Sequence, residues 1–194
     1  LRRISRETPG EWQDRIEAEA RSDDERLALR SAHPVWIIRA LRRALAAEGR
    51  AEELETLLEA DNLSPEVTLV ALPGLAPTGE PRRPYAPTAF GSPGGDPHRI
   101  VSASGGAVRV QDEGSQLVAL ALADAAPIRD GERWLDLCAG PGGKTALLAA
   151  IAHEHGAVLE ANEVVPARAG LVRNALEPVP GEVIVHEEDG RAFT

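Results

Sequence analysis

The residues that could carry out binding chemistry gather in residues 134–145 and in acidic positions further along the chain. An apolar run there contains Asp136 and leads to Gly140, Gly142 and Gly143. Glycine lets a backbone come close to a ligand, because a Cβ atom would block the approach. A strand that enters a glycine-rich turn and then a helix directs backbone N–H groups at a ligand. The stretch therefore predicts a small-molecule binding turn.

Three ligand classes compete for this turn. A P-loop requires glycine five residues before the Gly-Lys pair, where this chain has Cys138. A dinucleotide fingerprint requires a third glycine, where this chain has Thr145. A site for S-adenosylmethionine (SAM) needs an acidic residue near the end of the first strand and a looser glycine turn. Asp136 with Gly140 and Gly142 meets that requirement, so SAM is the favoured ligand.

Two further acidic positions support the SAM interpretation. Glu163 follows a second predicted strand, about 20 residues past the turn, where a carboxylate binds ribose hydroxyls. Asp189 follows a third predicted strand and could accept a hydrogen bond from an exocyclic adenine amine. Ligands bind at the carboxyl ends of parallel strands in open α/β sheets. Positions at three successive strand ends are stronger evidence than any one of them.

The elements that must position these residues alternate in type. Strands are predicted at residues 134–138, 157–161 and 183–185, with helices at 142–154 and 166–176 between them. An apolar helix at 115–123 comes before the first strand, with capping residues Asp112 and Ser115. Short connections between alternating strands and helices imply parallel strands with right-handed crossovers. The fold class is α/β, with a mainly helical region at the N-terminal side.

The N-terminal half has a different character. Helices are expected at residues 11–30, from Pro34 to about residue 48, and at 51–60, followed by a strand at 67–72. Residues 73–99 are dominated by proline and glycine, which predicts a long, mobile linker. The expected domains are 1–30, 31–108 including that linker, and 109–194.

Composition limits the range of functions. The formal net charge is -10, which argues against a strong general affinity for nucleic acid and leaves local contacts possible. The single cysteine excludes an internal disulfide, and apolar runs are too short for a membrane span. We therefore expect a cytoplasmic protein without a membrane partner. The five histidines form no metal-ligand pattern, so no metal is expected. Because the chain begins with leucine, we expect a piece of a longer protein.

Several motifs together resemble the RsmB/NOP2/Sun family of SAM-dependent RNA cytosine-5 methyltransferases, in its ribosomal RNA branch. Residues 110–117 and 135–145 carry the most specific likeness, and residues 33–39 add a weaker one. Further matches are Glu163, Arg168, Asn174 and residues 189–191. Residues 1–4 resemble the last helix of the NusB-like RNA-binding module of that branch.

The resemblance implies the first half of a Rossmann-like methyltransferase sheet that binds SAM and acts on ribosomal RNA of the 16S type. In this family a cysteine thiolate adds to cytosine C6, and C5 then takes the methyl group. That cysteine lies in an Asp-Ala-Pro-Cys motif, which we expect beyond residue 194, so the chain itself should hold no catalytic residue. A methyltransferase with another RNA acceptor and a non-catalytic nucleotide- or RNA-binding module are the alternatives. The cofactor-binding residues expected are Cys138, Ala139, Gly140, Pro141, Gly142, Gly143, Lys144, Glu163, Arg168 and Asp189.

Two positions depart from the family pattern, which usually has alanine at the place of Gly140 and aspartate at the place of Glu163. Both changes should still permit SAM binding. Cys138 is interpreted as a structural part of the cofactor loop at the end of a buried strand. Lys144 is the chain's only lysine, which favours a role directed at the site. Arg168 could equally pair with Glu163 or contact the ligand.

Overall fold

The computed structural model describes residues 8–193, so the expected NusB-like likeness of residues 1–4 lies outside the described residues. The chain divides into two compact units, one up to Pro65 and one from Glu66 onward. These packing units do not coincide with the expected boundaries at residues 30 and 108. The boundaries concern homologous modules rather than packing, so the assignment of residues 1–30 to a preceding module stays a prediction.

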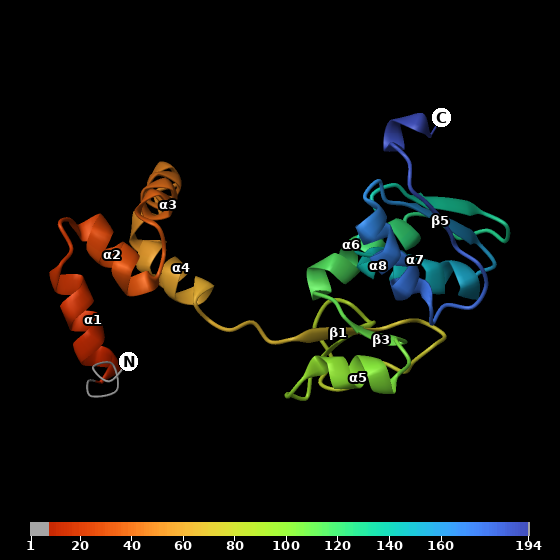
Figure 1. Cartoon of the computed structure of the whole chain (residues 1–194), viewed down its shortest axis with the longest axis horizontal. Helices are drawn as coiled ribbons and strands as arrows, with labels where there is room; N and C mark the ends of the chain where they lie inside the picture. Colours follow the sequence, from red (N-terminus) through yellow and green to blue (C-terminus); the bar gives the residue numbers. More distant parts are fainter. Residues whose placement is uncertain (1–7, 194) are drawn as a thin grey trace. The chain divides into compact units, whose positions relative to one another are not determined.

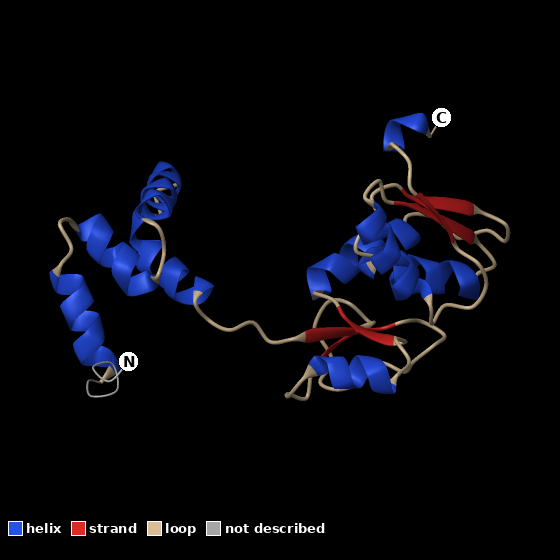
Figure 2. Cartoon of the chain, viewed as in Figure 1, coloured by secondary structure: helices blue, strands red, loops and turns tan. Residues whose placement is uncertain are grey.

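The first unit is helical (Figures 1 and 2). Its elements are α1 (Pro9–Ala18), α2 (Asp23–Ser31), α3 (Val35–Ala47), the short 3-10 helix η2 (Ala51–Glu53) and α4 (Leu54–Asp61). The single helix predicted for residues 11–30 is thus two helices. Ser22 causes the break, because its side chain accepts a hydrogen bond from the Glu25 N–H and so caps the start of α2. Ala28, Ile38, Leu54 and Leu58 form the core of this unit.

The second unit contains two sheets (Figure 2). Its first half holds β1 (Thr68–Ala71), β2 (Ala89–Gly91), α5 (Pro97–Ala103), β3 (Val108–Val110) and α6 (Glu113–Ala123). Its second half holds β4 (Arg133–Asp136), α7 (Gly143–Glu154), β5 (Val158–Asn162), α8 (Pro166–Leu176), β6 (Ile184–His186) and the 3-10 helix η3 (Gly190–Ala192). The antiparallel sheet has the strand order β2-β1-β3, and the parallel sheet has the order β4-β5-β6.

The prediction that residues 73–99 form a linker is wrong. This stretch contains β2, which pairs with β1 from Thr68↔Gly91 to Val70↔Ala89, and Ala86, Ala89 and Phe90 are buried. β1 is packed on both faces: Leu69 and Ala71 join a cluster with Phe90, whereas Val70 belongs to the core that surrounds α7. Prolines are tolerated because they lie in the turns that flank this short edge strand. The non-periodic sequence concealed a folded segment.

Helix α7 is the centre of the second unit. Residues 145–152 are buried, which is the pattern of a helix covered on all sides rather than of a surface helix. Helices α6 and α8 contact α7, and α7 contacts β5 on the face where Leu159 and Ala161 are buried. Figure 1 shows these helices together beside the strand β5.

The strand predicted as buried at residues 134–138 is only half-buried. β4 alternates between exposed and partly buried residues. The parallel register places Leu135 beside Glu160, and Glu160 beside Ile184, so these side chains share one face of the sheet. Leu135 and Ile184 are exposed there. An apolar sequence run alone could not distinguish a strand covered on both faces from one covered on a single face.

The first testable consequence concerns where the chain is cut by protease. We expect chymotrypsin to cleave first after Leu63, in the irregular connection between α4 and β1, rather than after Tyr85. The two residues are similarly exposed, at 73% and 75%. Glu113 Oε1, however, accepts hydrogen bonds from the N–H groups of Tyr85 and Ala86, at 2.7 and 2.9 Å, and so holds that segment in place.

The measurement is a time course of limited proteolysis with mass spectrometry. Leu63→Ala removes the expected first cut, and Glu113→Ala should bring on the cut after Tyr85. Early cleavage after Tyr85 in the unaltered chain would restore the linker interpretation of residues 73–99.

Candidate functional site

Three loops meet where the parallel strands end. β4, β5 and β6 pair in parallel, with Asp136 beside Ala161 and Asn162 beside His186, so their carboxyl ends lie at one edge of the sheet. A pocket of about 440 Å³ lies at this edge. Its lining residues are Leu137, Cys138, Asn162, Glu163, Val164, Arg168, Asp189, Gly190 and Arg191. The pocket therefore brings together four of the expected site residues: Cys138, Glu163, Arg168 and Asp189.

Asn162 joins the three loops and had no role in the sequence interpretation. Its Nδ2 donates to Leu137 O at 3.2 Å and to Glu188 O at 3.1 Å, and its Oδ1 accepts from Glu188 N at 3.0 Å. The residue is 2% exposed. The loop after β4 and the loop after β6 are thus attached to the end of β5 by one amide. The available signal was an amide at the end of an otherwise apolar strand, immediately before Glu163.

Glu163 lies at the base of the pocket with its carboxylate already bound. Oε1 accepts from Val165 N at 3.0 Å, and Oε2 accepts from Gly140 N at 3.2 Å. Arg168 Nε lies 3.4 Å from Oε2, and Arg168 Nη2 donates to Gly140 O at 2.6 Å. The side chain of Glu163 is 7% exposed. Of the two roles left open for Arg168, the structure contains the pairing with Glu163.

Gly140 and Gly142 of the glycine turn have different structural roles. Gly142 has φ +104°, and a Cβ atom there would lie 2.7 Å from the Cβ of Ala175 and 3.0 Å from the Cα of Val172. Gly142 therefore permits the close packing of α7 against α8. Gly140 faces the pocket side, since a Cβ there would lie 2.2 Å from Glu163 Oε2. The other six expected residues are outside the set that lines the pocket: Ala139, Gly140, Pro141, Gly142, Gly143 and Lys144.

Asp136 is engaged by the helix that follows it. Thr145 Oγ1 lies 2.7 Å from Asp136 Oδ2, to which it donates, and 3.3 Å from Ala139 O. Thr145 is fully buried. Thr145 thus stands at the third position of the dinucleotide pattern. Its hydroxyl connects the first turn of α7 to the end of β4 and so helps to fix the glycine turn between them.

Asp189 lies at the pocket and also caps a helix. Its Oδ1 accepts from Arg191 N at 3.0 Å at the start of η3, and the Arg191 guanidinium pairs with the same carboxylate. The hydrogen bond from the Arg191 side chain, and then the one from its backbone, lower the pKa of Asp189 below its usual range. The carboxylate therefore stays ionised at the rim of the site.

Cys138 and Lys144 are both exposed in the structure. Cys138 was expected at the end of a buried strand, but it is exposed and lines the pocket. The difference follows from β4, which ends at Asp136 and leaves residue 138 in the loop. Lys144 is exposed in the first turn of α7. Asp112 caps α6 as predicted, by accepting from Gly114 N, whereas Ser115 lies inside the helix.

Gln111 is a second residue that the sequence interpretation left without a role. It is 7% exposed, and its Oε1 is buried without a hydrogen-bond partner. Its Nε2 donates to Ser115 Oγ at 3.3 Å. The amide faces the start of α7: a Cβ on Gly143 would lie 3.7 Å from Gln111 Cδ. A buried acceptor without a partner is uncommon and carries an energetic cost in this position.

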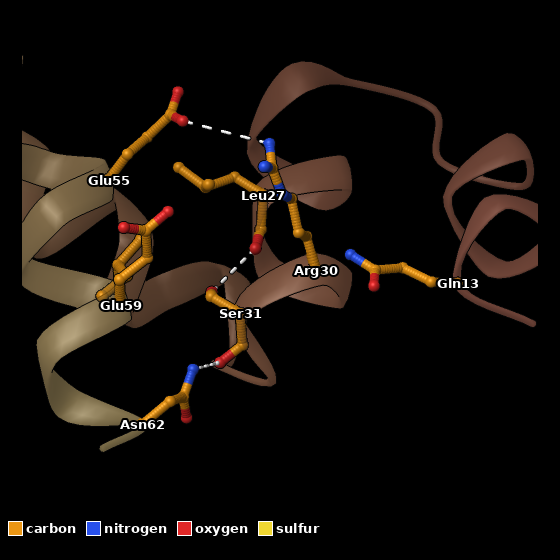
Figure 3. A pocket seen from close by; sticks show the side chains of 8 residues that line it. Gln13, Leu27, Arg30, Ser31, Glu55, Glu59 and Asn62 are labelled. Carbon is orange, nitrogen blue, oxygen red and sulfur yellow. Dashed lines mark hydrogen bonds and ion pairs between the residues drawn. The ribbon is translucent and has the colours of Figure 1, made fainter. Parts of the chain in front are cut away.

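A smaller cavity, of about 130 Å³, lies in the helical unit (Figure 3). Its polar groups are bound to one another: Asn62 Nδ2 donates to Ser31 O at 2.8 Å, and Ser31 Oγ donates to Leu27 O at 2.7 Å. Figure 3 also shows Arg30 paired with Glu55. This cavity is a small gap between helices, and several of its polar groups already have partners, so it is the weaker candidate for a ligand site.

Metal-ligand clusters and membrane-spanning helices are both absent from residues 8–193. Within that range no group of three or more His, Cys, Asp and Glu side chains could hold a metal ion. None of the helices in the same range is both long enough and apolar enough to cross a bilayer.

The chain is similar in sequence to known methyltransferases. Residues 123–194 match the family described as 16S rRNA methyltransferase RsmB/F. A Mycobacterium tuberculosis protein named as a methyltransferase, Rv1407, is 42% identical over 98% of this chain and 43% of its own length. The ribosomal RNA small subunit methyltransferase B of Escherichia coli is 28% identical over 92% of this chain and 41% of its own length. The chain thus spans about two fifths of the curated relatives it matches.

Solved structures agree on the fold. A crystal structure titled PH0851 superposes with a TM-score of 0.75 at 22% identity, over 99% of this chain and 42% of that one. A methyltransferase homologue from Pyrococcus horikoshii superposes with a TM-score of 0.61 at 21% identity, over 84% of this chain and 55% of that one. The expected fold, a partial Rossmann-like methyltransferase sheet preceded by helices, is confirmed.

The central position of Asn162 generates a prediction. Asn162→Ala should lower the free energy of unfolding by about 1–3 kcal/mol, because it leaves part-buried backbone groups of Leu137 and Glu188 without partners. Urea unfolding followed by circular dichroism measures the change. Asn174→Ala is the matched control, because Asn174 lies exposed on α8. Equal stability of the two variants would show that the hydrogen bonds of Asn162 do not stabilise the loops.

Proposed function

Because the chain belongs to the RsmB/NOP2/Sun family of methyltransferases, we propose that it forms the SAM-binding part of an enzyme that methylates C5 of cytosine in ribosomal RNA. One observation carries the cofactor assignment. A carboxylate, Glu163, lies buried at the end of the second parallel strand, beside the glycine turn that follows the first. A carboxylate in that place binds ribose hydroxyls in nucleotide-binding α/β folds.

The residues present fit SAM. The pocket is of the size that small-molecule sites have, and it combines apolar surface from Leu137 and Val164 with the carboxylates of Glu163 and Asp189. The unpaired Gln111 oxygen near the start of α7 adds a buried acceptor close to the turn. Acidic groups suit a ligand that carries a sulfonium, an ammonium and ribose hydroxyls, and they suit a phosphate-rich ligand less well.

Within this proposal each part of the pocket has a task. Glu163 accepts from the ribose hydroxyls, Asp189 accepts from the adenine amine, and the exposed backbone of the turn lies along the rest of the ligand. SAM, when bound, supplies an activated methyl group. Arg168 holds Glu163 in place. Among the expected contacts, Lys144 in the first turn of α7 is available for a carboxylate, since a cation and a helix N-terminus both attract an anion.

A dinucleotide is the competing ligand, and the turn argues against it. The third glycine of that fingerprint serves close packing of helix and strand. Here the position is Thr145, whose hydroxyl is used to bind Asp136. Asp136 and Thr145 thus form a local bond that the dinucleotide pattern does not contain.

The cofactor proposal is tested by titration. Glu163→Ala should weaken SAM binding by about tenfold or more, since loss of a buried hydrogen-bonding partner costs about 1–3 kcal/mol. Isothermal titration with SAM and with S-adenosylhomocysteine measures the change. Glu182→Ala is the matched control, because it removes the same charge from an exposed position outside the pocket. Equal affinities of the two variants would remove Glu163 from the site, and tighter binding of NAD than of SAM would overturn the cofactor assignment.

A second test concerns catalysis by residues 1–194 alone. We expect no methyl transfer to unmodified 16S ribosomal RNA, because the only thiol of this sequence, Cys138, belongs to the cofactor loop. Incubation with labelled SAM and scintillation counting of the RNA measures transfer. Methylation that occurs with this chain and disappears in Cys138→Ser would make Cys138 the nucleophile and contradict the proposal.

A further inference from the structure

The contact between Gly140 and Glu163 carries an inference about how the site is built. A Cβ atom on residue 140 would lie 2.2 Å from Glu163 Oε2, 2.9 Å from Glu163 Cδ and 2.9 Å from Arg168 Nε. Cβ atoms in proteins essentially never come within 3.0 Å of a non-bonded heavy atom of another residue. The space that a methyl group would fill at position 140 is therefore the space that the Glu163 carboxylate uses.

The carboxylate cannot easily move out of that space. Glu163 Oε2 accepts from Gly140 N, while Oε1 accepts from Val165 N, so both oxygens are anchored to backbone. Arg168 closes the arrangement, because its Nη2 donates to Gly140 O while its Nε faces Glu163 Oε2. The backbone of residue 140 thus contributes both its N–H and its C=O to a ring that contains the carboxylate and the guanidinium.

The burial of Glu163 makes this ring important for a ligand. The side chain is 7% exposed, whereas that of Arg168 is 52% exposed. A buried carboxylate with fixed donors has one orientation, and a ligand that uses its remaining lone pairs meets a preorganised acceptor. A displaced carboxylate would present its oxygens elsewhere in the same pocket, and the free energy needed to reorder them would lower the affinity for the ligand.

We propose that Gly140 is a positioning residue for Glu163, so that the side chains at positions 140 and 163 can change only together. An alanine at 140 displaces the carboxylate of glutamate, but it is tolerated when residue 163 is aspartate, whose carboxylate is withdrawn by one methylene. Arg168 is a positioning residue in the same ring. This inference rests on the proposed function, because it assigns the ring to the ribose end of the SAM site.

A double-mutant cycle in the full-length protein tests the coupling. The variants are Gly140→Ala, Glu163→Asp and the pair together, each titrated with SAM. Gly140→Ala should weaken SAM binding by about tenfold or more in the glutamate background, and by no more than about threefold in the aspartate background. An equal factor in the two backgrounds would overturn the inference, and so would a Gly140→Ala variant with the affinity of the unaltered protein.

Gly190→Ala, made in the same two backgrounds, is the matched control. It places a methyl group at the same pocket, but that group would lie 3.2 Å from the flexible side chain of Leu137 and does not meet Glu163. Its effect on SAM affinity should be the same factor in both backgrounds. A background-dependent effect of the size seen for Gly140→Ala would overturn the inference, because the coupling would then be general to the pocket.

Thermal unfolding without ligand separates this inference from the proposed function. Gly140→Ala should lower the midpoint in the glutamate background and leave it nearly unchanged in the aspartate background. If the unaltered protein binds no SAM but the midpoints show this pattern, the steric pair stands and the cofactor assignment fails. If SAM binds the unaltered protein and both the affinities and the midpoints are additive, the cofactor assignment stands and the pair fails.

Discussion

The amide of Asn162 is the interaction on which the geometry of the site depends. A parallel sheet places the ends of its strands at one edge, but it does not fix the loops that follow. Asn162 does so, because it stands at the end of the middle strand and binds backbone groups of the loops on both sides. Glu163 follows directly, so the same attachment sets the position of the pocket carboxylate. Loops tied in this way can present polar groups to a ligand at fixed distances.

The glycine turn is a second constraint, and its glycines serve different ends. Gly142 lets α7 approach α8, and so it belongs to the packing of the helices. Gly140 leaves room for the carboxylate of Glu163, and so it affects the pocket through that residue. Thr145 then fixes the first turn of α7 to Asp136 at the end of β4. The turn is consequently fixed by contacts with α8, with Glu163 and with Asp136.

The antiparallel sheet belongs to the same unit as the parallel one. Gln116, fully buried in α6, accepts from Thr88 Oγ1 at 2.7 Å and donates to Gln111 O at 3.0 Å and Leu69 O at 3.3 Å. These bonds connect α6 with the segment before β2, with β1 and with the residue that follows β3. The antiparallel sheet is therefore packed against the rest of the second unit through α6, although residues 73–99 have the composition of a linker.

The sequence by itself determined the order of strands and helices from α6 to β6, because apolar runs of strand and helix length alternate there with short turns. It also determined that acidic residues follow successive strands, and it identified the family through the residues of the glycine turn. It was wrong about residues 73–99, because proline and glycine content reports on turns and not on whether a short strand between them finds a partner. It was wrong about the burial of β4 and Cys138, because an apolar run does not reveal which face of a sheet is covered.

Only the tertiary structure decided how these residues act on one another. Asn162 and Gln111 had no role in the sequence pattern, since an amide becomes informative only when its partners, or their absence, are known. Gly140 and Glu163 stood as two separate departures from the family pattern, 23 positions apart. In the folded chain they are in contact, because parallel strands bring the ends of β4 and β5 to the same edge, and the methyl group absent from one makes room for the longer side chain of the other.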